Sequence, residues 1–163
     1  MSTKRIKMKV VDNFLNKDDF NKLKDMVFKS DFYYAPFVSS KNATDGYYFE
    51  RNIFSKCRIM SPIFSLIEPV LDKLNVKALV RAKINMYPRN DRLIEFGQHA
   101  DTDFKCNTFI LSLNTCDGFT RIGKDKTVTS KENTGVYFPS NIFHNGTNCT
   151  NQNVRVNINI NYF

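Results

Sequence analysis

Two histidines and one aspartate are the residues of this sequence whose types and spacing fit metal chemistry. His99 and His144 are its only two histidines, and Asp101 follows the first of them by two positions. Residues two apart in an extended strand point to the same side, so His99 and Asp101 can bind one ion together. Two imidazoles and one carboxylate on one face of an ion are the donor set of non-haem Fe(II) oxygenases. Zinc accepts the same donors, but a hydrolytic zinc site usually adds a nearby Glu or another water-activating base, and none has a clear position here.

An arginine lies beyond the second histidine, in a strand-like alternating run. Val154, Val156 and two isoleucines occupy one face of this run, and Arg155 and Asn157 occupy the other. The planar guanidinium can bind a carboxylate through two parallel hydrogen bonds, which lysine cannot reproduce. The pattern therefore indicates a carboxylate-binding residue, with an exposed strand arginine as the alternative.

These features give the C-terminal half of the chain, roughly Arg81 to Phe163, a likeness to a known family. It resembles the 2-oxoglutarate- and Fe(II)-dependent oxygenases, and most of all the small prolyl-hydroxylase-like members, including versions encoded by marine bacteriophages. Tyr87-Pro88 after an extended strand and the segment 108–114 are similar to family positions. Ser112 stands where such prolyl hydroxylases often have tyrosine, and only Gly118 remains of their Gly-Gly-Glu-Thr turn.

The resemblance implies an enzyme with Fe(II) as its metal cofactor, 2-oxoglutarate as its cosubstrate and O2 as its oxidant. It implies hydroxylation of a C–H bond coupled to decarboxylation of 2-oxoglutarate to succinate and CO2, with no catalytic residue assigned beyond the metal ligands. The implied metal ligands are His99, Asp101 and His144. The implied cosubstrate-binding residues are Arg155 and Tyr87 at the distal carboxylate, with Asn157 and Thr108 as further candidates.

Three functions remain open at this stage. The resemblance favours a prolyl 4-hydroxylase-like enzyme acting on a proline-containing peptide or protein. A nucleic-acid oxygenase or dealkylase is the first alternative, because Arg155-Val156-Asn157 matches the start of an Arg-x-Asn-x-Thr-x-Arg signature; Asn159 and Asn161 stand where its Thr and second Arg belong. The second alternative is a non-enzymatic, cupin-like metal-binding module.

The periodicity of apolar residues predicts helices first and strands afterwards. A helix capped by Asn16 and running to about Ser30 and a helix from Pro62 to Leu74 are expected. Strands are expected at 6–11, 76–87, 106–114, 118–121, 127–130, 136–138 and 153–162, and the segment 93–101 contributes His99 and Asp101. Residues 31–54, rich in Phe and Tyr, are predicted to form a loop that either packs on the core or contacts substrate, and Asn145-Gly146 a tight turn. This order predicts one domain over 1–163, a mainly β double-stranded β-helix (a jelly-roll, cupin-like barrel) with flanking N-terminal helices.

Composition restricts the class of protein further. With 163 residues, 42% hydrophobic and 13% aromatic, the sequence is that of a globular domain. A net charge of +8 favours anionic partners, nucleic acid included, or simply a solvated basic surface. The four cysteines lack Cys-x-x-Cys spacing, and the first residues lack the apolar core of a signal peptide. We therefore expect reduced thiols and a cytoplasmic location, which is the host cytoplasm if a phage encodes the protein. No apolar run is long enough for a bilayer, so no membrane association is expected.

Overall fold

The chain folds into two antiparallel sheets and two helices in a computed structural model that describes residues 7–39 and 46–163. In this part of the chain the large, eight-stranded sheet has the order β1-β9-β6-β11-β5-β3-β2, with β4 paired to β3, and the small sheet has the order β10-β7-β8. The large sheet contains β1 (Lys9–Val11), β2 (Tyr33–Ala35), β3 (Tyr48–Ser55), β4 (Arg58–Ile59), β5 (Leu79–Pro88), β6 (Asn107–Ser112), β9 (Thr134–Pro139) and β11 (Val154–Tyr162). The small sheet contains β7 (Phe119–Ile122), β8 (Lys126–Thr129) and β10 (His144–Gly146). This mainly β, two-sheet architecture confirms the predicted jelly-roll class.

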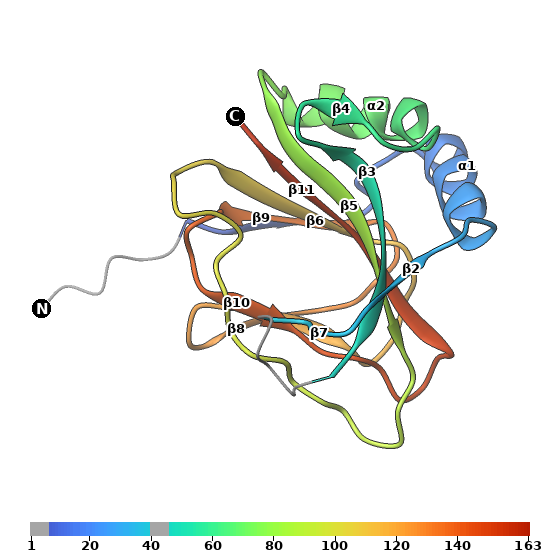
Figure 1. Cartoon of the computed structure of the whole chain (residues 1–163), viewed down its shortest axis with the longest axis vertical. Helices are drawn as coiled ribbons and strands as arrows, with labels where there is room; N and C mark the ends of the chain where they lie inside the picture. Colours follow the sequence, from blue (N-terminus) through green and yellow to red (C-terminus); the bar gives the residue numbers. More distant parts are fainter. Residues whose placement is uncertain (1–6, 40–45) are drawn as a thin grey trace, which may run out of the picture.

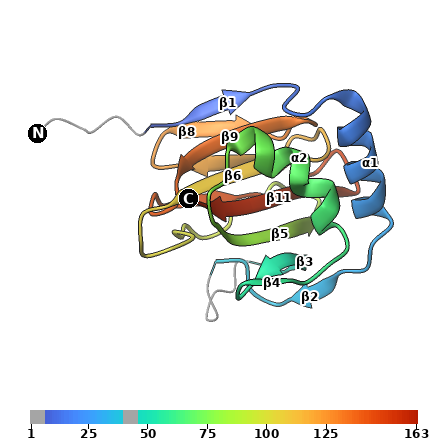
Figure 2. The same ribbon diagram turned by 90° about the horizontal axis from the view of Figure 1, so that it is seen from above.

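Both helices lie against the same face of the large sheet, and the small sheet lies on its other side (Figure 1). Helix α1 (Lys17–Phe28) begins after Asn16, whose side chain accepts a hydrogen bond from the backbone N–H of Asp19, as predicted. Helix α2 (Phe64–Leu74) continues through Pro69 and ends where Asn75 adopts a left-handed conformation, φ 53°. Viewed from above, α2 lies over the middle of the large sheet and crosses β11, its central strand (Figure 2).

The central strand β11 separates the core from the polar interior between the sheets. It pairs antiparallel with β5 on one side and with β6 on the other. Val156, Ile158 and Ile160 are fully buried in the core beneath the helices, where each contributes about 1.5–3 kcal/mol of burial free energy. The alternate side chains point to the opposite face, which is also buried. These are Arg155, Asn157, Asn159 and Asn161.

Two local predictions are wrong. Residues 31–54 are not simply a loop, because they contain β2 and most of β3, with residues 40–45 outside the described part. Asn145-Gly146 does not form a tight turn, because both residues pair with β7 inside strand β10. The segment 93–101, which carries His99 and Asp101, forms isolated bridges, from Glu95 to Thr147 and from His99 to His144. The predicted strand from Ile6 starts outside the described residues, and its described part forms β1.

The remaining expectations concern thiols and membranes. All four cysteines lie within the described part of the chain and are free thiols. Neither helix within residues 7–39 and 46–163 combines the length and the apolar composition that crossing a bilayer requires.

Candidate metal centre and its cavity

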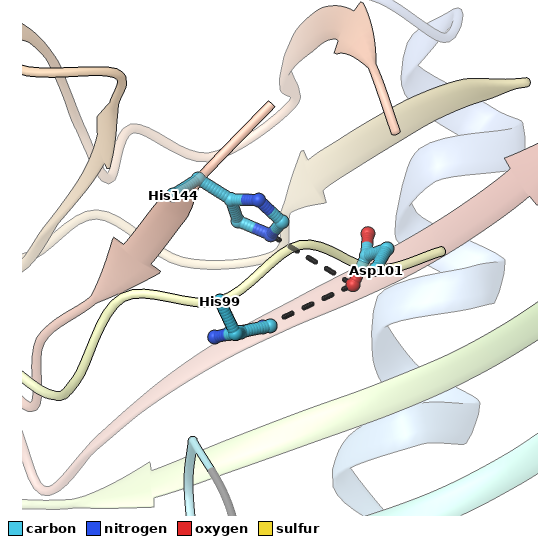
Figure 3. Close-up of side chains that lie close together, drawn as sticks. All are labelled: His99, Asp101 and His144. Carbon is cyan, nitrogen blue, oxygen red and sulfur yellow. Dashed lines mark ion pairs between the residues drawn. The ribbon is translucent and has the colours of Figure 1, made fainter. Parts of the chain in front are cut away.

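Backbone pairing brings the two histidines together. The His99 N–H donates to the His144 carbonyl at 2.9 Å, and the reverse hydrogen bond measures 2.8 Å. This antiparallel bridge places the two imidazoles side by side, with ring centroids 4.7 Å apart (Figure 3). Each Nδ1 faces a backbone carbonyl, Gly97 O at 3.5 Å and Ile142 O at 3.0 Å. A carbonyl only accepts, so the neutral form of each imidazole carries its proton on Nδ1 and leaves the Nε2 lone pair free for a metal ion.

Asp101 completes a set of three converging donors. Its Oδ1 lies 3.9 Å from His99 Nε2 and 3.8 Å from His144 Nε2, and the three side chains point toward one another (Figure 3). The three ligand atoms all lie within 4.8 Å of one another. The structure therefore brings the three predicted metal ligands together, although the segment around His99 and Asp101 is not a regular strand.

The charge states of these side chains suit a divalent cation. Burial raises the pKa of Asp101, but the charges of His144 and Arg81 and the hydrogen bonds from Asn161 and Asn159 outweigh it and lower the pKa to about 2. Burial, followed by the proximity of His144, lowers the pKa of His99 below 6.5. At neutral pH the site thus offers one anionic oxygen and an unprotonated His99, as metal binding requires.

The donors line a cavity of about 270 Å³ between the two sheets. Its wall on β5 presents Arg81, Lys83, Asn85 and Tyr87, the polar face predicted for this strand. Four buried side-chain atoms have no hydrogen-bond partner in the described part of the chain, and all belong to residues lining this cavity. They are Asn85 Oδ1, Asn145 Oδ1, Arg155 Nε and Asn159 Oδ1. Because buried polar atoms are rarely left unpaired, this distribution points to a polar ligand in the cavity.

Arg155 occupies the cavity end formed by the start of β11 and is 1% exposed. Nη1 donates to the Thr147 carbonyl at 2.9 Å and Nη2 to the Thr120 hydroxyl at 2.8 Å. Among the described residues no carboxylate forms a salt bridge with Arg155, and burial lowers its pKa, since the charged form is desolvated. A guanidinium keeps its charge in proteins, so this group is a buried cation without an anion.

An aromatic column supports this end of the cavity. Tyr87 stacks on Tyr48 with ring centroids 5.6 Å apart and on Phe96 at 5.4 Å. The Arg155 guanidinium lies 5.7 Å from the centre of the Tyr87 ring, within the range of a cation–π interaction. Burial raises the pKa of Tyr87 to about 12, so its phenol stays protonated and can donate a hydrogen bond.

The predicted cosubstrate residues fall into two groups. Arg155, Tyr87 and Asn157 line the cavity, whereas Thr108 lies behind Asp101 and donates its hydroxyl to Asp101 Oδ2 at 3.0 Å. Sequence reasoning assigned no role to Asn159 and Asn161, yet both donate to Asp101. It also missed Arg81, which forms an ion pair with Asp101 at 3.0 Å. The strand alternation could have identified them, because Arg81 shares a face of its strand with Tyr87. Asn159 and Asn161 share a face with Arg155 in the same way.

Comparison with solved structures places this site on a known scaffold. A prolyl-4-hydroxylase from Pseudomonas putida matches with a TM-score of 0.63 and 13% identity, over 97% of this chain and 93% of that one. An oxidoreductase of the 2OG-Fe(II) oxygenase family from Burkholderia pseudomallei matches with a TM-score of 0.69 and 11% identity, over 95% and 84%. A prolyl hydroxylase from Trichoplax adhaerens, in complex with a hypoxia inducible factor peptide fragment, matches with a TM-score of 0.63 and 16% identity, over 96% and 83%. No protein-family model and no curated protein matches the sequence significantly.

The chain thus has the fold of the 2-oxoglutarate–Fe(II) oxygenases and carries a His99–Asp101–His144 triad on it. The donor set of two imidazole nitrogens and one carboxylate fits Fe(II). Arg155 lines the same cavity without a carboxylate partner in the described part of the chain, which fits an anionic cosubstrate. The bacteriophage resemblance gains no support from these comparisons.

Proposed function

We propose that the protein is a 2-oxoglutarate- and Fe(II)-dependent dioxygenase that hydroxylates a C–H bond of a peptide, with proline as the target residue. One observation carries the proposal: three metal donors converge in a cavity that also contains a buried guanidinium, which has no carboxylate partner among residues 7–39 and 46–163. Bound Fe(II), with 2-oxoglutarate and O2, supplies the oxidising chemistry that converts C–H to C–OH while succinate and CO2 are released.

The protein's own groups bind and orient the reactants. His99, Asp101 and His144 hold the metal through Nε2, Oδ1 and Nε2. Arg155 binds the distal carboxylate of 2-oxoglutarate, whose negative charge compensates the buried guanidinium. The protonated phenol of Tyr87 is a second donor for that carboxylate, and Asn157 lines the same wall.

Exposure indicates where the substrate approaches. The side chain of His99 is 33% exposed, while those of His144 and Asp101 are 4% and 3% exposed. Substrate therefore reaches the metal from the side of His99, and the buried face formed by His144 and β11 excludes water from the cosubstrate.

A proline-containing peptide is the substrate class that these observations favour. Prolyl hydroxylases from two organisms share the fold. Val38 and Tyr48, from the aromatic-rich part of the chain, line the cavity.

The nucleic-acid alternative is less favoured, for a structural reason. Asn159 and Asn161, at the Thr and second Arg positions of the signature, are buried and donate to Asp101. Side chains held in this way are not free to contact a base or a phosphate.

Turnover with defined substrates tests the proposal. The protein is incubated with Fe(II), 2-oxoglutarate and O2, together with proline-rich peptides or methylated oligonucleotides, and succinate and product masses are measured. Succinate together with the gain of one oxygen atom on proline is the expected result. Demethylation of a base would favour the alternative, and absence of succinate with His99→Ala behaving like the parent would indicate a metal-binding module.

A further inference from the structure

We propose that Thr108, Asn159 and Asn161 are positioning residues that hold Asp101 so that it ligates the metal through Oδ1 alone. The inference rests on the proposed metal centre and concerns how this chain builds it. Asp101 Oδ2 accepts three hydrogen bonds, from Thr108 Oγ1 at 3.0 Å, Asn159 Nδ2 at 3.2 Å and Asn161 Nδ2 at 2.9 Å. These donors occupy Oδ2, so only Oδ1 faces the two histidines.

The orientation of these donors is fixed by their other contacts. Asn161 is fully buried; its Nδ2 also donates to Thr108 Oγ1 at 2.9 Å, and its Oδ1 accepts from Arg81 Nε at 3.0 Å. Because Thr108 accepts from Asn161, its own hydroxyl proton is available to Asp101 Oδ2. The hydrogen bonds therefore run in one direction, from Asn161 through Thr108 to the carboxylate, and a reversed amide would place oxygen against oxygen.

Strand register places this set directly beneath Asp101. Asn161 of β11 lies opposite Thr108 of β6 on one side and opposite Arg81 of β5 on the other. Asn159 lies two residues before Asn161 and so shares its face. Three adjacent strands thus supply four donors to one carboxylate, since Arg81 Nη2 also reaches Oδ1, at 3.0 Å.

A fixed carboxylate has two consequences for a metal site. A carboxylate that ligates through one oxygen leaves one more coordination position free than one that ligates through two, and cosubstrate and O2 need such positions. Outer partners that orient a ligand typically contribute about 10–100-fold to metal affinity. We therefore expect loss of these donors to weaken the affinity for metal rather than the fold.

Metal affinity without turnover tests the inference. Binding of Mn(II) is measured by electron paramagnetic resonance of the free ion, at neutral pH and without 2-oxoglutarate, for the parent and for Thr108→Val and Thr108→Ser. Valine keeps the shape of threonine without its hydroxyl, whereas serine keeps the hydroxyl. We expect Thr108→Val to bind Mn(II) about 10–100-fold more weakly than the parent, and Thr108→Ser to bind within about threefold of it.

A matched control separates this role from ordinary packing. Thr134 is also a buried threonine, and its hydroxyl donates to the carboxylate of Asp12 at 2.8 Å, outside the metal-binding triad. Thr134→Val should therefore leave Mn(II) affinity unchanged. Urea unfolding of the metal-free proteins shows whether each variant is folded, and Asn159→Leu replaces Thr108→Val as the test if the latter does not fold.

The outcomes distinguish this inference from the proposed function. Parent-like Mn(II) affinity in folded Thr108→Val or Asn159→Leu, with a parent that binds Mn(II) and forms succinate, would overturn the positioning role alone. A parent that binds no Mn(II) would overturn the metal centre and the proposed function with it. An equal loss of affinity in Thr134→Val would show a general packing effect and also refute the positioning role.

Discussion

Replacement of Arg155 by lysine is the sharpest test of the cosubstrate site. Lysine keeps the charge but has no planar fork, so it cannot both retain the contacts with Thr147 and Thr120 and bind a carboxylate in parallel geometry. Loss of one hydrogen bond to a charged group costs about 1.5–3 kcal/mol. At about 1.4 kcal/mol for each factor of ten, the Kd of 2-oxoglutarate should rise by about 10–150-fold.

The assay is calorimetric titration of 2-oxoglutarate into Mn(II)-loaded protein without O2. The matched ligand is 2-oxopentanoate, which carries a methyl group in place of the distal carboxylate. The parent should strongly prefer the diacid, and Arg155→Met, which removes the cation, should lose most of that preference. The reasoning would be falsified if Arg155→Lys bound 2-oxoglutarate as the parent does, or if the parent bound both ligands equally.

Three further outcomes follow from the structure. Burial raises the pKa of Glu50, but the charge of Lys83 and the hydrogen bonds from Tyr48 and Lys83 outweigh burial and hold this pKa below 4.5. The Glu50 carboxylate therefore contributes stability above pH 4.5 that is lost as the pH falls. In urea unfolding, Glu50→Gln should lose less stability on acidification than the parent does. A Cβ at Gly118 would lie 2.6 Å from Arg155 Cδ, so Gly118→Ala should cost about 1–3 kcal/mol and weaken 2-oxoglutarate binding in the same titration. Mn(II) at about a hundredfold its Kd should raise the melting temperature by about 5–10 °C, an increase that chelation and His144→Ala abolish.

The metal ligands could be predicted from sequence because the candidates were so few. With two histidines in the chain, only one pair was available, and a carboxylate two residues from the first completed the set. The alternation in the run from Val154 onward likewise predicted which side chains of β11 face the core. Such predictions need only the period of a strand, which is local information.

The supporting residues depended on pairing between distant segments, which no local pattern contains. Asn161 holds Asp101 because β11 aligns it with Thr108 and Arg81, and that register is a tertiary property. Asn145-Gly146 has a turn-forming sequence, but pairing with β7 outweighs that preference. The aromatic stretch before Phe54 lacks clear alternation, so its two strands were missed.

The long-range pairing in this fold, of β11 with its neighbours and of His99 with His144, also bears on when during folding the protein can bind metal. This strand must join β5 and β6, which are far from it in sequence, and such non-local pairing is slow. His144 pairs with His99 only once the chain between them has folded back, so an unfolded chain contains no preformed metal site. Added metal should therefore slow unfolding without accelerating refolding. In a cell, we expect the apoprotein to fold first and to bind its metal ion afterwards.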